Sequence, residues 1–190
     1  SEALTIILKK NDPTAAAKQV SLTELGSIKI NKEERAKMLK TIPRTSIIGF
    51  LIGVLPGAGA TIASFLAYGM ERNLVSDEEK EKFGKGSVHG LSAPETANNA
   101  ACSGAFVPLL TLGIPGSGTT AVMLGALLGF GIQPGPRLYV TNPEIFWSVI
   151  MSMYIGMVIL LILNLPLIPY IARILAVPKN YLIPLILFFS

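Results

Sequence analysis

The residues best suited to bind a small ion in this sequence lie at two Pro-Gly breaks inside apolar segments. A helix that starts after such a break presents free N–H groups and a positive dipole end to an anion, whereas carbonyl and hydroxyl oxygens suit a cation. The alternative is that the glycines only allow close helix packing. The candidate binding residues are Pro56, Gly57, Ala58, Gly59, Ala60 and Thr61 at the first break, and Pro115, Gly116, Ser117, Gly118, Thr119 and Thr120 at the second.

Two adjacent amides, Asn98 and Asn99, could add to this chemistry. A buried amide needs a partner, so each is expected to bond another helix, a ligand or an ion. Neighbouring helical positions point about 100° apart, so we expect one amide to face a cavity and the other a neighbouring helix. We choose Asn98 for the cavity because it lies one turn from Glu95. Glu95 itself could be a cation or proton site, or only an acid at a helix N-terminus.

The elements that must position these residues are interrupted membrane helices. Apolar arms of 11 residues flank the first break, and arms of 16 and 14 residues flank the second. The two longer arms reach only about 24 and 21 Å, against about 30 Å of bilayer hydrocarbon. Lipid cannot satisfy the free backbone groups of a break, so each break must lie inside protein or line a wet cavity. Transporters bind their substrates at such breaks.

Composition agrees with a membrane protein. The chain has 51% hydrophobic and only 15% charged residues, which is too few charges for an ordinary soluble domain. Of the 16 Lys and Arg residues, nine precede Thr45, so this end is expected to be a cytoplasmic flank, or else a helix that packs on a partner subunit. Asn31 followed by Glu34 marks a helix start there.

We expect an all-α integral membrane protein with interrupted helices, re-entrant or broken, as well as spanning helices. Polar loops on both sides of the first break favour a re-entrant hairpin over a broken spanning helix. The expected segments are a polar cytoplasmic loop with an interfacial helix (residues 1–44), a first interrupted membrane segment (45–70), a charged connector (71–92), a second interrupted segment (93–135), and a spanning helix, a kinked helix and the start of a truncated membrane helix (136–190).

Other kinds of site find little support in the sequence. The connector is interpreted as a solvated loop, and its His89, the single histidine, has no second His or Cys nearby to share a metal. Gly116 and Gly118 fit a loose dinucleotide fingerprint, but no strand precedes them. An intramembrane hydrolase could use Ser64 or Ser117 as nucleophile, yet neither apolar segment holds a His or Lys base. A purely structural scaffold would not need paired breaks, so transport remains the principal hypothesis.

Several runs of the sequence resemble the large permease subunit of tripartite tricarboxylate transporters, the TctA family. The runs are G-V-L-P-G-A-G-A-T-I-A-S-F from Gly53, A-P-E-T-A-N-N-A-A from Ala93 and P-L-L-T-L-G-I-P-G-S-G-T-T-A-V from Pro108, followed by I-Q-P-G-P, N-P-E-I-F-W and N-L-P-L. Thr96 stands where the family often has alanine, which is a conservative difference. The resemblance covers nearly everything after Arg44.

This resemblance implies a multi-pass protein of the bacterial inner membrane that is not an enzyme and needs no cofactor. It implies uptake of organic carboxylate anions, coupled to a cation gradient of Na⁺ or H⁺. The implied partners are a small membrane subunit and a periplasmic solute-binding protein that delivers the carboxylate, with no nucleic acid. The family's subunit is longer and has two related halves, so we expect this chain to be part of the second half of an inverted-repeat secondary transporter.

Overall fold

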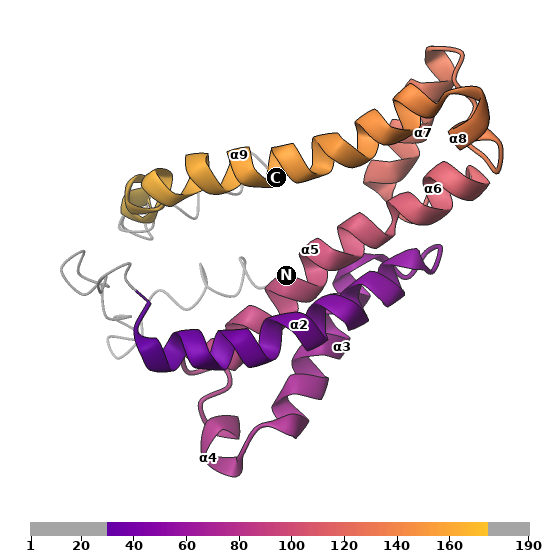
Figure 1. Ribbon diagram of the computed structural model, residues 1–190. Coiled ribbons are helices and arrows are strands. Elements are labelled where there is room, and N and C mark those ends of the chain that lie inside the picture. The colour runs from indigo at the N-terminus through magenta and orange to yellow at the C-terminus, as the bar shows by residue number, and fades with distance from the viewer. Residues whose placement is uncertain (1–29, 175–190) are drawn as a thin grey trace, which may run out of the picture. The chain divides into compact units, whose positions relative to one another are not determined.

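The computed structural model describes residues 30–174, and every regular element in that range is helical (Figure 1). Two compact units divide the chain, residues 30–155 and, in the described part, residues 156–174. The all-helical prediction is therefore confirmed for this range. The helices are α2 (Lys32–Val54), α3 (Gly59–Leu74), α4 (Asp77–Lys80), α5 (Val88–Gly104), α6 (Phe106–Leu112), α7 (Gly118–Gly129), α8 (Leu138–Thr141) and α9 (Pro143–Ile174).

Helix α2 begins where the sequence predicts, at a capping box. The Asn31 side chain accepts a bond of 2.7 Å from the Glu34 backbone N–H, and the Glu34 carboxylate accepts one of 2.9 Å from the Asn31 N–H. The helix then continues to Val54 without ending at residue 45, where the sequence places a boundary. A buried face with four-residue spacing explains the continuity: it consists of Thr41, Thr45, Gly49 and Gly53.

The first break is a tight turn that folds α3 back along α2. Gly57 has a φ of 84°, which is the left-handed region that glycine adopts without strain. Within the turn the Leu55 N–H donates to the carbonyl of Ile52 at 3.0 Å. On the far side of the turn, Arg44 of α2 pairs with Glu71 of α3, so the two helices run antiparallel. The two arms therefore form a helical hairpin.

Helices α2, α3 and α5 pack against one another (Figure 1), and the buried residues between them are mostly small. In each helix, small buried residues recur mostly every four positions. Residues with this spacing lie on one face of a helix and form a stripe along it. The fully or almost fully buried members besides those of α2 are Ala63 and Ala67 of α3 and Ala93, Ala97 and Ala101 of α5. We call this packing surface the small-residue seam.

Two glycines of α2 show how closely the seam is packed. A Cβ atom on Gly49 would lie 2.6 Å from the Cα of Ala97, and one on Gly53 would lie 2.6 Å from the Cα of Ala101. Only glycine fits at these positions, because the obstacle is backbone. In the sequence, Gly49, Gly53 and Gly57 have the four-residue spacing of one helix face, which permits close helix contact, and the structure confirms that contact for Gly49 and Gly53. Gly57, the third member of that proposed face, lies in the turn and has no neighbour within 4 Å.

The charged connector is shorter than the sequence predicts. Helix α3 extends to Leu74, and α5 already begins at Val88, with the Ser87 side chain accepting a 3.1 Å bond from the Gly90 N–H as its N-cap. His89 is consequently in a helix and not in a loop. The sequence reasoning failed because it judged residues 71–92 by their charge and did not test them for helical spacing.

Helix α9 is the clear membrane-spanning candidate. Its segment Pro143–Ile168 has 26 residues and a mean hydropathy of 2.4, and among the described residues it is the one helix long and apolar enough to cross a membrane. At about 1.5 Å per residue this gives about 39 Å, more than the bilayer core requires. The sequence predicts a break or kink after Leu163, but the helix continues through Asn164 and Pro166. A proline removes one backbone hydrogen bond without having to end a helix.

The hairpin yields a prediction of topology. Because α2 and α3 run antiparallel, cysteines replacing Lys32 and Lys85 should be labelled by a membrane-impermeant reagent from the same side of the membrane. Both positions are exposed, and the background should lack Cys102, which is also exposed. Labelling from opposite sides would mean that the chain crosses the bilayer between them and would exclude a re-entrant hairpin.

Candidate functional site

The first break offers an uncapped helix N-terminus. Helix α3 follows Ala58, and no side chain caps its first N–H groups. The carbonyl groups at the end of α2 lie on the other side of the same turn, where Pro56 and Gly57 are exposed. The hydroxyl of Thr61 lies in the first turn of α3, is exposed and has no hydrogen-bond partner among the described residues. Unsatisfied donors and acceptors therefore lie next to each other at this break.

At the second break, local hydrogen bonds cap both the end of α6 and the start of α7. Helix α6 ends at Gly113 in the left-handed conformation: the N–H of Gly113 bonds to the carbonyl of Leu109 at 3.0 Å, and the N–H of Ile114 bonds to the carbonyl of Pro108 at 3.2 Å. Helix α7 starts with a reciprocal cap: Ser117 N–H donates to the Thr120 hydroxyl at 2.8 Å, and Thr120 N–H donates to the Ser117 hydroxyl at 3.3 Å. Thr120 is only 2% exposed. Both side chains are thus engaged with each other.

The two breaks come together although they are far apart in the sequence. A Cβ atom on Gly116 would lie 3.4 Å from the Cβ of Ala105 and 3.7 Å from the carbonyl oxygen of Gly53. Gly53 belongs to the last turn of α2, directly before the first break. The buried Gly116 therefore places the second break against the end of α2.

The two asparagines differ in their partners, and not in the way that the sequence favours. The Asn98 amide donates to the hydroxyl of Ser64 on α3 at 3.3 Å, whereas the Asn99 amide donates to the carbonyl of Glu95 in its own helix at 2.9 Å. Asn98 is thus the amide that contacts a neighbouring helix. Asn99 and Glu95 are exposed, and Glu95 lies inside α5 and not at its start.

Neither proposed nucleophile has a base beside it. The Ser64 hydroxyl donates to the carbonyls of Ala60 at 3.0 Å and Pro94 at 3.2 Å. Among the described residues, the Ser117 hydroxyl bonds only to Thr120. Within residues 30–174 no group of three or more His, Cys, Asp and Glu side chains is arranged to hold a metal ion.

The sequence reasoning missed a buried polar cluster at the other end of the seam. Glu71 of α3 is 0% exposed, and its Oε1 atom accepts from the Thr41 hydroxyl at 2.8 Å. Arg44 donates to both carboxylate oxygens, from Nε to Oε2 at 2.8 Å and from Nη2 to Oε1 at 2.6 Å. The Nδ1 atom of His89 lies 2.9 Å from Oε1. We call Thr41, Arg44, Glu71 and His89 the Glu71 cluster.

A signal for this cluster was present in the sequence. Glu71 continues the four-residue spacing of Ala63 and Ala67, and His89 continues that of Ala93 and Ala97. Thr41 continues the buried face of α2 in the same way. The polar ends of three small-residue stripes therefore meet at one place, and extending each stripe by one step would have found them.

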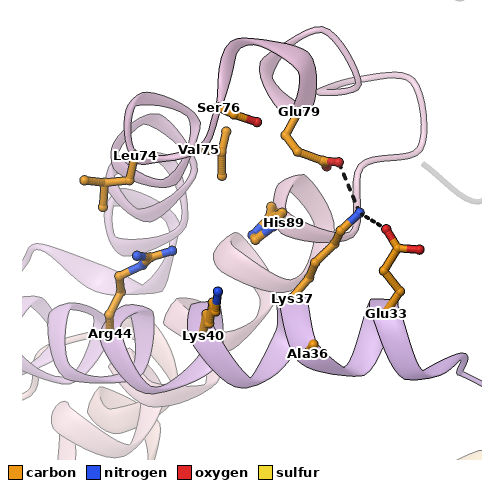
Figure 2. Close-up of a pocket in the computed structure, with 10 residues that line it drawn as sticks. All are labelled: Glu33, Ala36, Lys37, Lys40, Arg44, Leu74, Val75, Ser76, Glu79 and His89. Carbon is orange, nitrogen blue, oxygen red and sulfur yellow. Dashed lines mark hydrogen bonds and ion pairs between the residues drawn. The ribbon is translucent and has the colours of Figure 1, made fainter.

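A pocket of about 320 Å³ opens above the Glu71 cluster (Figure 2). Lys37 lies at its mouth and reaches Glu79 of α4 at 3.1 Å and Glu33 at 3.5 Å. Hydrogen bonds from Lys82 and Lys37 hold the pKa of the Glu79 carboxyl below its ordinary value. The link between α4 and α2 is therefore complete at neutral pH and is lost only as the pH falls through that lowered value.

Comparison with known proteins identifies the family. The whole chain, residues 1–190, matches the family described as "Tripartite tricarboxylate transporter TctA family". The chain belongs to the TctA family. This family consists of membrane transport proteins and not of enzymes, so the expected class is confirmed.

Two relatives of the chain come from Agrobacterium vitis. One, "Uncharacterized 52.8 kDa protein in TAR-I ttuC' 3'region", is 40% identical over 91% of this chain and 34% of its own length. The other, "Uncharacterized protein in TAR-II ttuC' 3'region", is 46% identical over 75% of this chain and 58% of its own length. No solved structure matches the chain. This TctA chain thus spans less than two thirds of either curated relative.

Proposed function

We propose that the chain forms part of the translocation pathway of a permease that takes up organic di- or tricarboxylate anions by secondary active transport. The permease is a multi-pass protein of the bacterial inner membrane and draws on a cation gradient. A periplasmic solute-binding protein delivers the carboxylate, and a small membrane subunit completes the system. Membership of the TctA family supports this assignment.

The observation that carries the proposal is the meeting of the two breaks. Gly116 lies against the carbonyl oxygen of Gly53 in the last turn of α2, so one residue of the second break packs next to the helix end that leads into the first break. Interrupted helices of transporters bind anionic substrates at helix N-termini and coupling cations at helix C-termini and unwound carbonyls. The uncapped start of α3 is the better anion site, because the cap between Ser117 and Thr120 already occupies donors of α7.

The cation would be held beside the anion. Carbonyl oxygens at the end of α2 are hard ligands of the kind that Na⁺ accepts, and the Asn98 carbonyl oxygen is a further one, since only its amide nitrogen bonds to Ser64. Opposite charges held close together stabilise each other more strongly in a site shielded from water than in bulk solvent. Binding of the cation would thereby raise the affinity for the carboxylate.

Two threonine substitutions test this site. Thr61→Val and Thr119→Val each remove an exposed hydroxyl that has no partner in the described part of the chain, and we expect each to raise the KM for carboxylate uptake about tenfold, the effect of one lost hydrogen bond to a charged group. Uptake is measured in cells that carry the complete permease, its small subunit and its binding protein.

Thr111→Val is the matched control. The Thr111 side chain is equally exposed, but its hydroxyl already donates to the Val107 carbonyl of its own helix at 2.6 Å. Its KM should stay within about twofold of the unaltered permease. If all three variants have the same KM, neither break forms part of the carboxylate site.

A further inference from the structure

The Glu71 cluster contains a buried carboxylate that holds an imidazole in one orientation. Glu71 Oε1 accepts bonds from Thr41 and Arg44 and lies 2.9 Å from His89 Nδ1. An ionised carboxylate can only accept, and the Thr41 hydroxyl, whose oxygen lies 2.7 Å from Nδ1, can accept as well, so we place the hydrogen atom on Nδ1. The neutral His89 ring then carries its free lone pair on Nε2. A carboxylate commonly fixes the tautomer of a working histidine in this way.

The free nitrogen is open to the pocket. His89 is one of the residues that line it, and Figure 2 places its ring in the middle of the lining side chains. The His89 side chain is only 9% exposed. No side-chain nitrogen or oxygen of the described residues is both fully buried and without a partner. Since Nε2 has no protein partner in that range, water must reach it through the pocket.

The charges around His89 come from every element packed on the pocket. Helix α2 contributes Lys37, Lys40 and Arg44 as cations and Glu33 as an anion, α3 contributes Glu71, and α4 contributes Glu79. Lys37 is paired with Glu79, and Arg44 is paired with Glu71. Because Lys37 and Arg44 each have an anionic partner, these two cations do not oppose a positive charge on the His89 ring. The Glu71 carboxylate directly stabilises an imidazolium.

We propose that the Glu71–His89 pair is a proton-binding site, at which water in the pocket delivers a proton to Nε2 of His89. The nitrogen lone pair forms the new N–H bond, one O–H bond of a hydronium ion breaks, and the charge of the Glu71 cluster rises by one. Imidazole suits this role because it exchanges protons near neutral pH.

The location suggests what the proton does. Glu71 and His89 belong to two different helices, and Thr41 and Arg44 tie both to α2. A positive charge gained by the Glu71 cluster acts on the hydrogen bonds that join α2, α3 and α5. These bonds lie about 20 Å along α2 from the first break. The structure thereby assigns H⁺ to this end of the hairpin as a coupling ion, in addition to the cation held at the break. This part of the inference rests on the proposed carboxylate transport.

Coupling is tested by comparing two modes of transport in vesicles that contain the complete permease. Exchange of labelled for unlabelled carboxylate needs no net proton movement, whereas accumulation driven by a pH gradient does. His89→Asn keeps an N–H donor near the Nδ1 position but cannot bind a proton. We expect the ratio of driven accumulation to exchange to fall at least tenfold in His89→Asn and in Glu71→Gln.

Glu81→Gln is the control, because Glu81 is exposed and lies in the connector between α4 and α5. It should keep the ratio of the unaltered permease. An unchanged ratio in His89→Asn would overturn the proposal, and so would a loss of exchange and accumulation in equal proportion. Absence of carboxylate exchange in the unaltered permease would instead contradict the proposed function.

Proton binding itself is tested without transport. In the permease labelled with ¹⁵N-histidine, the ring signals that disappear in His89→Asn belong to His89. At high pH they should show a protonated Nδ1 and an unprotonated Nε2, and both nitrogens should become protonated as the pH is lowered. A ring protonated on Nε2 at high pH, or signals that do not change between pH 5 and pH 9, would rule out the site.

Discussion

Glu71→Ala is expected to lower the free energy of unfolding of the detergent-solubilised permease by about 3 kcal/mol, the upper end of the range for hydrogen bonds to a charged group, because the Arg44 side chain is 38% exposed and water partly replaces the lost carboxylate. The carboxylate is 0% exposed and accepts hydrogen bonds from Arg44, Thr41 and His89. Alanine would leave the Arg44 guanidinium without its anion and would also open a cavity. The measurement is thermal or denaturant unfolding of purified protein, with Glu81→Ala as the exposed control.

A double substitution separates the buried charge from the packing. In Arg44→Leu with Glu71→Leu the unpaired charge is absent, so the double variant should be more stable than the sum of the two single variants predicts. The expected coupling energy is about 1–3 kcal/mol. Additive effects, or a Glu71→Ala variant as stable as Glu81→Ala, would mean that the ion pair does not hold the three helices together.

Gly53→Val should have the second largest effect. The Cβ atom would lie 2.6 Å from the Cα of Ala101, and neither backbone can move without separating α2 from α5. Overpacking of a core typically costs about 1–3 kcal/mol, and contact with backbone places this variant at the upper end. The expected result is a lower unfolding temperature and a smaller yield of folded permease.

The matched control is Gly69→Val in α3. Gly69 is also a glycine inside a helix, but a Cβ atom there would meet nothing within 4 Å. Valine should therefore be tolerated, apart from a small difference in helix propensity. Equal stability of Gly53→Val and Gly69→Val would contradict the packing of the small-residue seam.

The parts of the fold that could be predicted depend on local sequence. Asn31 and Glu34 start α2 because both halves of a capping box are only three residues apart. The breaks were visible because Pro and Gly act on their own backbone. Close contact at Gly49 and Gly53 followed from their spacing, although the partner helix, α5, did not.

The Glu71 cluster could not be assigned so directly, because its members are contributed by three helices. Glu71 and His89 are 18 residues apart with a charged stretch between them, and local composition made both look solvated. The hydrogen bond from Asn98 to Ser64 could not be predicted for a related reason, since the two residues lie 34 positions apart. Which side chains meet is decided by the antiparallel packing of α2, α3 and α5, and local pattern does not encode it.

Helix α2 is attached in two different ways along its length. In residues 30–174, its side-chain hydrogen bonds to other helices all come from Lys37, Thr41 and Arg44. From Gly49 to Gly53 none of its side chains hydrogen-bonds to another helix in that range, and the two glycines lie against the backbone of Ala97 and Ala101 in α5. Helix α2 is therefore fixed by directional hydrogen bonds near Glu71 and is held by close packing alone near the first break. Any rearrangement of the break should therefore be a rotation of α2 about its Glu71 end, and not a translation of the whole hairpin.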